Sequence, residues 1–392
     1  MHLVDFLLLF LAFVGHVAIA VTIFNRLHAI GLPCSVVKLT EKLVILAAAV
    51  VLLLFSIYFL LQGFAVYQPA FASGRFWPPL LYLIPCWAAS LCVAPLWIWR
   101  KLASRRPVSY LANTSRLVSL AVERPQSLVG TRSTGLLLKV PGNQIFQLSI
   151  EEKTFQPARL PAALDGFTIA HLSDLHMTGQ LKRPFFDALI DRTNELDCDV
   201  VMVTGDIVEK APCLDWIAPT LGRLQSRYGV YYVLGNHDQR LSDVGALHRL
   251  LADLGHIHVG GRCLEVDWRG APVLLAGNEL PWFKPAADMS DFPPSPEGPF
   301  RLLLSHSPDQ FFWAQQQEFD LMLAGHTHGG QIRLPVYGPL IAPSRYGVMY
   351  ASGVFQQGPT LMHVSRGVSG LQPIRLNCPP ELTRITLRSP AV

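Results

Sequence analysis

The stretch FTIAHLSDLH, residues 167–176, is an apolar run that ends in Ser173-Asp174-Leu175-His176. Short apolar and β-branched runs that stop at turn residues predict buried strands, so we expect a strand over 167–172. The same patterns predict helices over 184–196, 216–227 and 242–254, and further strands over 200–203, 230–234, 273–276, 302–305, 321–324, 361–365 and 382–387. This alternation predicts an α/β fold with sheets between helices.

Polar residues follow five of these expected strands. They form Asp174-x-His176, Gly205-Asp206, Gly235-Asn236-His237-Asp238, His306, and Gly325-His326-Thr327-His328. Ligand sites in α/β sheets form beyond the carboxyl ends of strands, so we expect these side chains to share one crevice. The candidate metal ligands are Asp174, His176, Asp206, Asn236, His306, His326 and His328.

The residue types indicate the chemistry of this site. Imidazole nitrogens with carboxylate and amide oxygens suit Zn, Mn or Fe(II), and seven ligands are too many for one tetrahedral ion. Two ions about 3.5 to 4 Å apart can hold a hydroxide and clamp the oxygens of a phosphorus centre during in-line displacement. The sequence therefore predicts a dinuclear hydrolytic centre.

The five motifs, in this order, resemble the signature of the calcineurin-like metallophosphoesterases over roughly residues 160–387. The runs GHTHGGQ (325–331) and PIRLNCPPE (373–381) are similar to a bacterial membrane-associated branch of that superfamily. The resemblance implies a four-layer fold, a β-sandwich flanked by helices. Gly277-Asn278-Glu279 departs from the Asp-containing segment of many relatives, which concerns the substrate rim rather than the metal core.

The resemblance also implies roles for single residues. The first ion would be held by Asp174, His176, Asp206 and His328, and the second by Asp206, Asn236, His306 and His326, with Asp206 as the bridge. The catalytic residues would be His237, placed over the scissile phosphate, and Asp238, which would orient the His237 imidazole.

The first third of the chain is apolar. Runs of 20, 32 and 24 uncharged residues lie between Asp5, Arg26, Lys42, Arg75 and Arg100. Since about 20 apolar residues cross a bilayer, we expect spans over 6–24, 43–67 and 77–99. A cleaved signal peptide is the alternative for the first span, but the first six residues lack the usual basic charge. Basic residues in the first loop and after Trp99 predict a multi-pass inner or plasma membrane protein with a cytoplasmic catalytic domain.

The composition limits domains and partners. We expect a membrane anchor over 1–106, a membrane-proximal connector over 107–143 with one short helix near 117–123, and a metallophosphoesterase domain over 144–392. Of 32 Lys and Arg, 8 lie in the anchor and 24 beyond it, against 26 acidic residues there, which argues against nucleic acid as a partner. Seven cysteines without metal or redox spacing indicate a reducing compartment.

Other residues leave alternatives open. His16 is expected to pack beside Gly15, with a functional intramembrane role as the alternative. His171 either supports the site or is buried beside the sheet, and His248, His256, His258 and His363 are expected to be surface or packing residues. Arg333, Arg345, Arg366 and Arg375 are expected to form salt bridges, with a contact to a substrate phosphate as the alternative, for which Arg375 is the first candidate. The segment 278–299 is either a lid or a loop packed on the body.

The leading hypothesis is a membrane-anchored phosphoesterase in which a metal-bridging hydroxide attacks phosphorus. Its cofactors would be two divalent ions (Mn, Fe or Zn), and its partners a phosphoester, by analogy a membrane lipid or lipid precursor, and the bilayer. The alternatives are an inert metal-binding scaffold at the membrane and a transport or sensing role for the spans. Monoester or diester preference and oligomeric state stay open.

Overall fold

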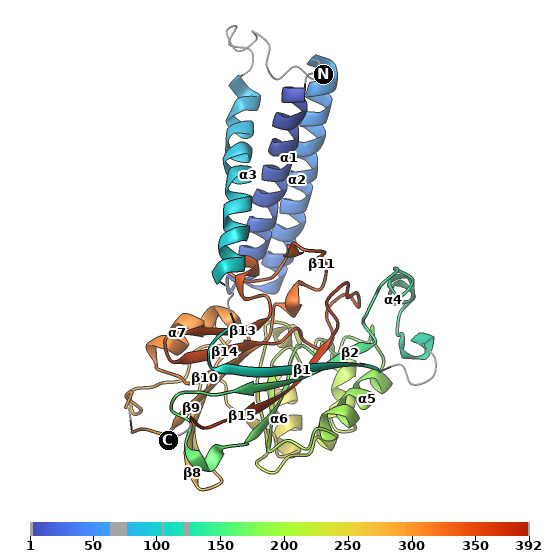
Figure 1. The fold of residues 1–392 in the computed structure, drawn as a ribbon. Coiled ribbons are helices and arrows are strands. Elements are labelled where there is room, and N and C mark those ends of the chain that lie inside the picture. The colour runs from blue at the N-terminus through green and yellow to red at the C-terminus, as the bar shows by residue number, and fades with distance from the viewer. Residues whose placement is uncertain (1–2, 63–76, 104–105, 121–124, 296, 391–392) are drawn as a thin grey trace. The chain divides into compact units, whose positions relative to one another are not determined.

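The computed structural model describes the chain except for residues 1–2, 63–76, 104–105, 121–124, 296 and 391–392 (Figure 1). The described residues form two compact units, 1–105 and 106–392. Each unit has its own core.

The first unit contains three helices, α1 (Leu3–Leu27), α2 (Cys34–Gln62) and α3 (Trp77–Ala103). All three are long and apolar enough to cross a membrane, as the sequence predicts, although residues 63–67 of the expected second span lie outside the described residues. Helix α3 continues through Pro85 and Pro95. These three helices therefore indicate that the chain associates with a membrane.

Helices α1 and α3 approach each other closely at Gly15. A Cβ added there would lie 1.7 Å from the carbonyl oxygen of Cys86. The neighbouring His16 is buried, and its Nδ1 contacts the hydroxyl of Tyr82. His16 therefore has the packing position that the sequence predicts beside a small residue.

The second unit contains two large sheets and a small hairpin. The first sheet has the order β1 (Tyr110–Ser119), β2 (Gln147–Phe155), β15 (Glu381–Leu387), β3 (Thr168–Leu172), β4 (Val200–Thr204), β5 (Val230–Val233), β6 (Ile257–His258). The second has the order β13 (Gly353–Gln357), β14 (Thr360–Val364), β10 (Leu321–Ala324), β9 (Phe300–Ser305), β8 (Ala271–Asn278), β7 (Cys263–Trp268). The hairpin pairs β11 (Arg333–Leu334) with β12 (Gly338–Pro339).

Helices cover the outer faces of both sheets. The α-helices of this unit are α4 (Arg132–Leu137), α5 (Arg183–Asn194), α6 (Val244–Asp253) and α7 (Phe311–Gln316). The 3-10 turns are η2 (Pro125–Leu128), η3 (Ala162–Leu164), η4 (Ala211–Trp216), η5 (Leu221–Arg223), η6 (Asp238–Arg240), η7 (Pro308–Gln310), η8 (His328–Gly330) and η9 (Gly347–Tyr350). Figure 1 shows α5 and α6 beside the strands of this unit.

The alternation of side chains along the strands explains the four layers. Leu302 and Leu304 of β9 point into the core between the two sheets, whereas Leu303 between them packs toward α7. In β4, Val200 points between the sheets and Val201 packs toward α5 and α6. Both faces of each sheet are thus buried, as in the expected four-layer α/β sandwich flanked by helices.

Two local expectations are wrong. Residues 216–227 do not form one helix. Trp216 ends η4 and residues 221–223 form η5, because the backbone leaves the helical region at Thr220 (φ −110°, ψ −80°) and again at Leu224 (φ −60°, ψ 135°). The helix expected near 117–123 is also wrong over residues 117–119, which belong to the strand β1. Residues 121–124 lie outside the described part of the chain. The strand that pairs with β1 is β2, which begins only at Gln147. The pairing is therefore long-range, and a local sequence pattern does not reveal it.

Candidate metal centre

The motif residues lie directly beyond strands of both sheets. Asp174 and His176 follow β3, Asp206 follows β4, and His326 and His328 follow β10. All five have a positive φ, between 46° and 71°, which is the left-handed region that non-glycine residues seldom occupy. Such strain costs of the order of 1 kcal/mol per residue and persists where the surroundings over-determine it, typically at functional sites.

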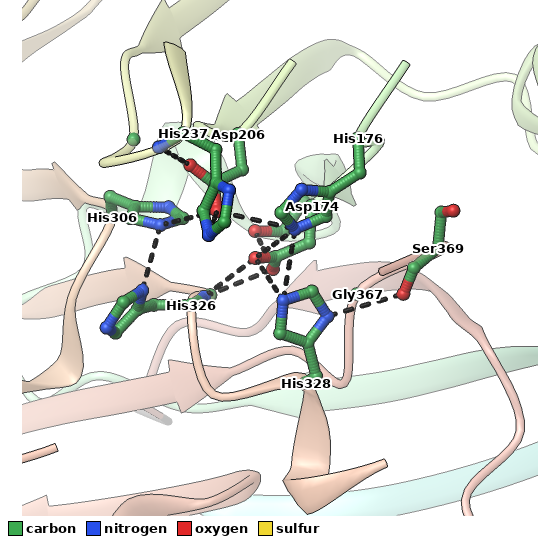
Figure 2. Close-up of polar contacts among 12 residues, drawn as sticks. Asp174, His176, Asp206, His237, His306, His326, His328, Gly367 and Ser369 are labelled. Atoms are coloured by element: carbon green, nitrogen blue, oxygen red, sulfur yellow. Dashed lines mark hydrogen bonds and ion pairs between the residues drawn. The ribbon is translucent and has the colours of Figure 1, made fainter. Parts of the chain in front are cut away.

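One cluster joins Asp174, His176, Asp206 and His328, whose potential ligand atoms all lie within 4.8 Å of one another. The Nε2 atoms of His176 and His328 are 3.0 Å apart. Nε2 of His176 lies 3.4 Å from Oδ2 of Asp206, and Nε2 of His328 lies 3.4 Å from Oδ1 of Asp174. Figure 2 shows these two rings facing each other beside the carboxylates.

A second cluster joins Asp206, His306 and His326 in the same way. Nε2 of His306 is 3.2 Å from Oδ2 of Asp206, 3.2 Å from Nδ1 of His326 and 3.2 Å from Oδ1 of Asn236. Asp206 thus belongs to both clusters (Figure 2). The structure brings together all seven residues that the sequence predicts as ligands.

The contacts of Nδ1, the ring nitrogen that points away from the cluster, indicate whether these histidines could bind a cation through Nε2. Nδ1 of His306 contacts the Thr204 carbonyl at 2.7 Å, and Nδ1 of His176 contacts Glu209 at 2.7 Å. Since both partners only accept, Nδ1–H donates and each ring, when neutral, turns a lone pair at Nε2 toward the cluster. Lone pairs that face each other and carboxylates repel unless a cation lies among them, so the residues fit bound metal.

A carboxylate that the sequence analysis missed, Glu209, supports this centre. Its Oε1 lies 2.7 Å from Nδ1 of His176 and 2.8 Å from Nδ1 of His237, and its Oε2 accepts from Arg240 at 2.6 Å. Burial alone would raise the pKa of Glu209, but the hydrogen bonds from both imidazoles outweigh it and hold this pKa well below its usual range. Glu209 lies three residues after Asp206, but this spacing alone does not reveal its contacts with the two imidazoles.

Asp238 does not have the orienting role that we expected. Its Oδ1 accepts from the amides of Ile207 and Val208, and its Oδ2 accepts from the amide of Gly235. Burial, followed by the charge of Asp206, raises the pKa of Asp238 to about 7. Asp238 therefore ties together the loops that carry the ligands, while the carboxylate beside the His237 ring is Glu209.

His171 and His363 form a buried chain behind the site. Nε2 of His171 contacts the Thr204 hydroxyl at 2.8 Å, and its Nδ1 contacts Nδ1 of His363 at 2.9 Å. Nε2 of His363 contacts Nζ of Lys153 at 2.8 Å, and Lys153 donates to Glu381 at 2.6 Å. Burial lowers the pKa of His363 to about 4. His363 is a packing residue as expected, although it does have a carboxylate neighbour, Glu381, at 3.4 Å.

Arg375 is fully buried, which does not fit the alternative of a phosphate contact. Its guanidinium donates to the carbonyls of His328, Arg366, Gly367 and Ser369. It therefore holds the segment that follows β14 against the loop that carries His328. The neighbouring Arg366 forms ion pairs with Glu151 and Glu381.

The segment 278–299 reaches the metal clusters through Trp282. The Trp282 ring centroid lies 4.7 Å from that of His326 and 5.5 Å from that of His306. Gln310 donates to the Leu280 carbonyl, which helps to hold this part of the segment in place. Glu279 lies apart from the clusters, where Oε1 accepts from the Leu234 amide at 2.6 Å.

The fold and the site define a class of protein, a two-sheet α/β protein with two clusters of possible metal ligands at its strand ends. The family model of the calcineurin-like phosphoesterases matches residues 167–330. The uncharacterised metallophosphoesterase YkuE of Bacillus subtilis (strain 168) is 30% identical over 253 residues, which are 61% of this chain and 85% of YkuE. The chain belongs to the calcineurin-like phosphoesterase family, and it is a metal-dependent phosphoesterase.

Two further relatives differ in how much of their length is matched. A transmembrane protein with metallophosphoesterase domain from Bos taurus is 31% identical over 252 residues, which are 59% of this chain and 55% of that protein. The phosphodiesterase YaeI of Escherichia coli (strain K12) is 29% identical over 226 residues, which are 56% of this chain and 82% of YaeI.

Proposed function

We propose that this chain hydrolyses phosphoesters at a dinuclear metal centre, with Asp174, His176, Asp206 and His328 around one ion and Asp206, Asn236, His306 and His326 around the other. The observation that carries this proposal is the 3.0 Å approach of two imidazole Nε2 atoms beside two buried carboxylates. The ligand types suit Mn, Fe or Zn. When bound, such ions supply an activated water and neutralise the phosphoryl oxygens.

His237 is the residue proposed to act on the leaving group. Its Nδ1 is held by Glu209 at 2.8 Å, and its Nε2 lies 4.0 Å from Oδ2 of Asp206. The His237 side chain is 10% exposed. Held in this way, a protonated His237 donates its Nε2 proton to the departing oxygen as the bond from phosphorus to that oxygen breaks.

The test measures hydrolysis of bis(p-nitrophenyl) phosphate and p-nitrophenyl phosphate by the full chain with added Mn²⁺, Fe²⁺ or Zn²⁺. We expect His237→Ala to lower turnover by about 10² to 10⁴ while the metal content stays normal, because this residue is proposed to act on the proton and not on the ions. Asp206→Asn should lower both turnover and metal content. Undiminished turnover in both variants would contradict the proposal, and a metal-loaded chain inert toward a broad phosphoester panel would favour the scaffold alternative.

The membrane helices support a finer proposal on substrate and topology. We propose a multi-pass anchor over 1–106, the connector over 107–143 with its strand β1, and a cytoplasmic catalytic domain that acts on a lipid-linked phosphoester. Basic residues in the first loop and after the third span support this orientation. A reporter fused after Val392 should be active only in the cytoplasm. Lipid and lipid-precursor pools should change in cells that carry Asp206→Asn.

A further inference from the structure

The hairpin of β11 and β12 presents an apolar surface to solvent. Its exposed apolar side chains are Ile332, Leu334, Pro335, Val336, Tyr337 and Ile341, and Val336 at the tip is 84% exposed. The one charged residue among 332–341 is Arg333. Its side chain turns inward and donates to the Gly329 carbonyl and to the Ser352 hydroxyl. We call residues 332–341 the apolar hairpin.

The apolar hairpin is joined closely to the metal centre. It begins four residues after His328, and η8 forms the connection. A Cβ added at Gly330 would lie 2.4 Å from Cβ of Pro339 and 2.8 Å from the carbonyl of Ile341, so the two ends of the hairpin meet at this glycine. The amide of Arg333 also donates to the Leu376 carbonyl at 2.9 Å. Any surface that the apolar hairpin contacts therefore lies beside the loop that carries His326 and His328.

The chain itself keeps a bilayer within reach of this unit. The third apolar span ends at Leu102 and β1 begins at Tyr110, so only seven residues separate them. A fully extended chain spans at most about 3.6 Å per residue, or roughly 29 Å over the eight steps from Leu102 to Tyr110. The first strand of this unit therefore starts within that distance of the end of the span, which leaves a bilayer within reach of the unit.

The charge around the apolar hairpin also favours a bilayer. The 60 residues between Asp320 and Glu381 contain no Asp or Glu, and Arg345 in this stretch is exposed. Anionic headgroups repel acidic surfaces and attract basic ones. An exposed apolar segment that carries no acidic residue is typical of segments that lie in the interfacial region of a membrane.

We propose that the apolar hairpin inserts its tip into the interfacial region of the bilayer that the chain's own helices cross. Insertion there places the loop of His326 and His328 beside the lipid headgroups. A phosphoester in a lipid headgroup can then reach the metal centre without leaving the membrane, a consequence that rests on the proposed function.

The direct test places a benzophenone photocrosslinker in the full chain in phospholipid nanodiscs. Position 336 is the test, position 257, an exposed apolar residue on β6, is the matched control, and position 53 in α2 is the positive control. We expect phospholipid adducts at 336 and 53 and a much lower yield at 257, because position 257 is not part of the proposed membrane contact. Adducts at 53 but not at 336, or adducts at 336 to a second protein chain, would overturn the proposal.

A second arm separates this proposal from the proposed function. Val336→Asp should lower hydrolysis of a phosphoester lipid in nanodiscs by about tenfold, since a charge replaces an apolar side chain at the membrane. Turnover of soluble bis(p-nitrophenyl) phosphate should not change, and Ile257→Asp should affect neither substrate. If the Val336→Asp variant hydrolysed the phosphoester lipid as fast as the unmodified chain does, the proposed role of the hairpin would be contradicted. No turnover of either substrate by the unmodified chain contradicts the proposed function and leaves the photocrosslinking result valid.

Discussion

Glu209 connects a proposed metal ligand with the proposed proton donor through one buried carboxylate. Oε1 lies within 2.8 Å of both His176 and His237, while Arg240 neutralises part of its charge. A carboxylate in this position fixes the tautomer and the direction of both rings. Glu209 is therefore a positioning residue, because it acts through its two histidines.

Glu209→Gln should lower both metal affinity and turnover by about 10- to 100-fold, the range found when the partner of a ligating histidine is replaced. Glu209→Asp, which keeps the charge, should recover part of both. Metal affinity by equilibrium dialysis gives a readout that is independent of turnover. Glu195→Gln, at an exposed carboxylate paired with Arg192, is the control and should change neither. Normal metal affinity and turnover in Glu209→Gln would show that the two contacts do not position the rings.

His256 gives a pH prediction away from the metal centre. Burial lowers the pKa of His256 to about 4, from 6.5 in the unfolded chain. As pH falls below 6.5 the unfolded state gains a proton that the folded state does not bind, so the folded state loses stability, by up to about 3 kcal/mol near pH 4. In thermal unfolding of the full chain in detergent, His256→Gln should therefore lose less stability than the unmodified chain between pH 7 and 4.5. Parallel pH curves for the two proteins would contradict this.

The ligand residues could be predicted from the sequence because each follows an apolar run that ends in a polar motif. Glu209 could not be assigned in this way, since its role depends on where the rings of His176 and His237 turn. The contacts of Asp238 and Arg375 could not be predicted either, for a related reason. Both side chains bond backbone groups of loops that meet only in the folded chain.

At the level of elements, strand ends must pack tightly enough to bring the two sheets' motifs together. Gly325 follows β10, and a Cβ there would lie 1.8 Å from Oγ of Ser173 and 2.5 Å from Oδ2 of Asp174, which follow β3. The glycine therefore allows the His326 loop to reach Asp174, to whose carboxylate the His326 amide donates at 3.1 Å.

Gly325→Ala should separate these two strand ends and lower metal content, and it should destabilise the chain by about 1 to 3 kcal/mol, as overpacking does. Thermal unfolding and metal analysis of the full chain measure the two effects. Gly135→Ala in α4 is the control, because a Cβ there meets only a side-chain atom of Val129 at 4.0 Å. Equal metal content in the two variants would show that the strand ends can adjust.

Elements with strong local patterns were predicted well, and the others were not. Strands β3, β4, β9 and β10 lie where short apolar runs indicate them. The long edge strand β1 was missed because most of its side chains are exposed and its hydrogen bonds come from β2. The division of strands between two sheets also does not follow from local pattern, since it depends on pairings such as β15 between β2 and β3.

At the level of the whole catalytic unit, the two proposed ions would connect the two sheets. Asp174, His176, Asp206 and Asn236 come from the seven-stranded sheet, and His306, His326 and His328 come from the six-stranded sheet. Without cations, two buried carboxylates and several imidazole lone pairs converge at the junction, which opposes the packing of one sheet on the other. Bound metal should therefore stabilise the fold as well as support catalysis.

Removal of metal with EDTA should lower the thermal unfolding temperature of the full chain in detergent, and readdition of Mn²⁺ or Zn²⁺ should restore it. Free metal at about 1,000 times its dissociation constant stabilises the folded state by about 4 kcal/mol, which for a domain of this size corresponds to roughly 10 °C. Asp206→Asn, which removes the shared ligand, should lose most of this response. Asp253→Asn, at an exposed position on α6, should keep it. An unfolding temperature that EDTA does not change, in a chain shown to have bound metal beforehand, would mean that the sheets pack without help from the ions.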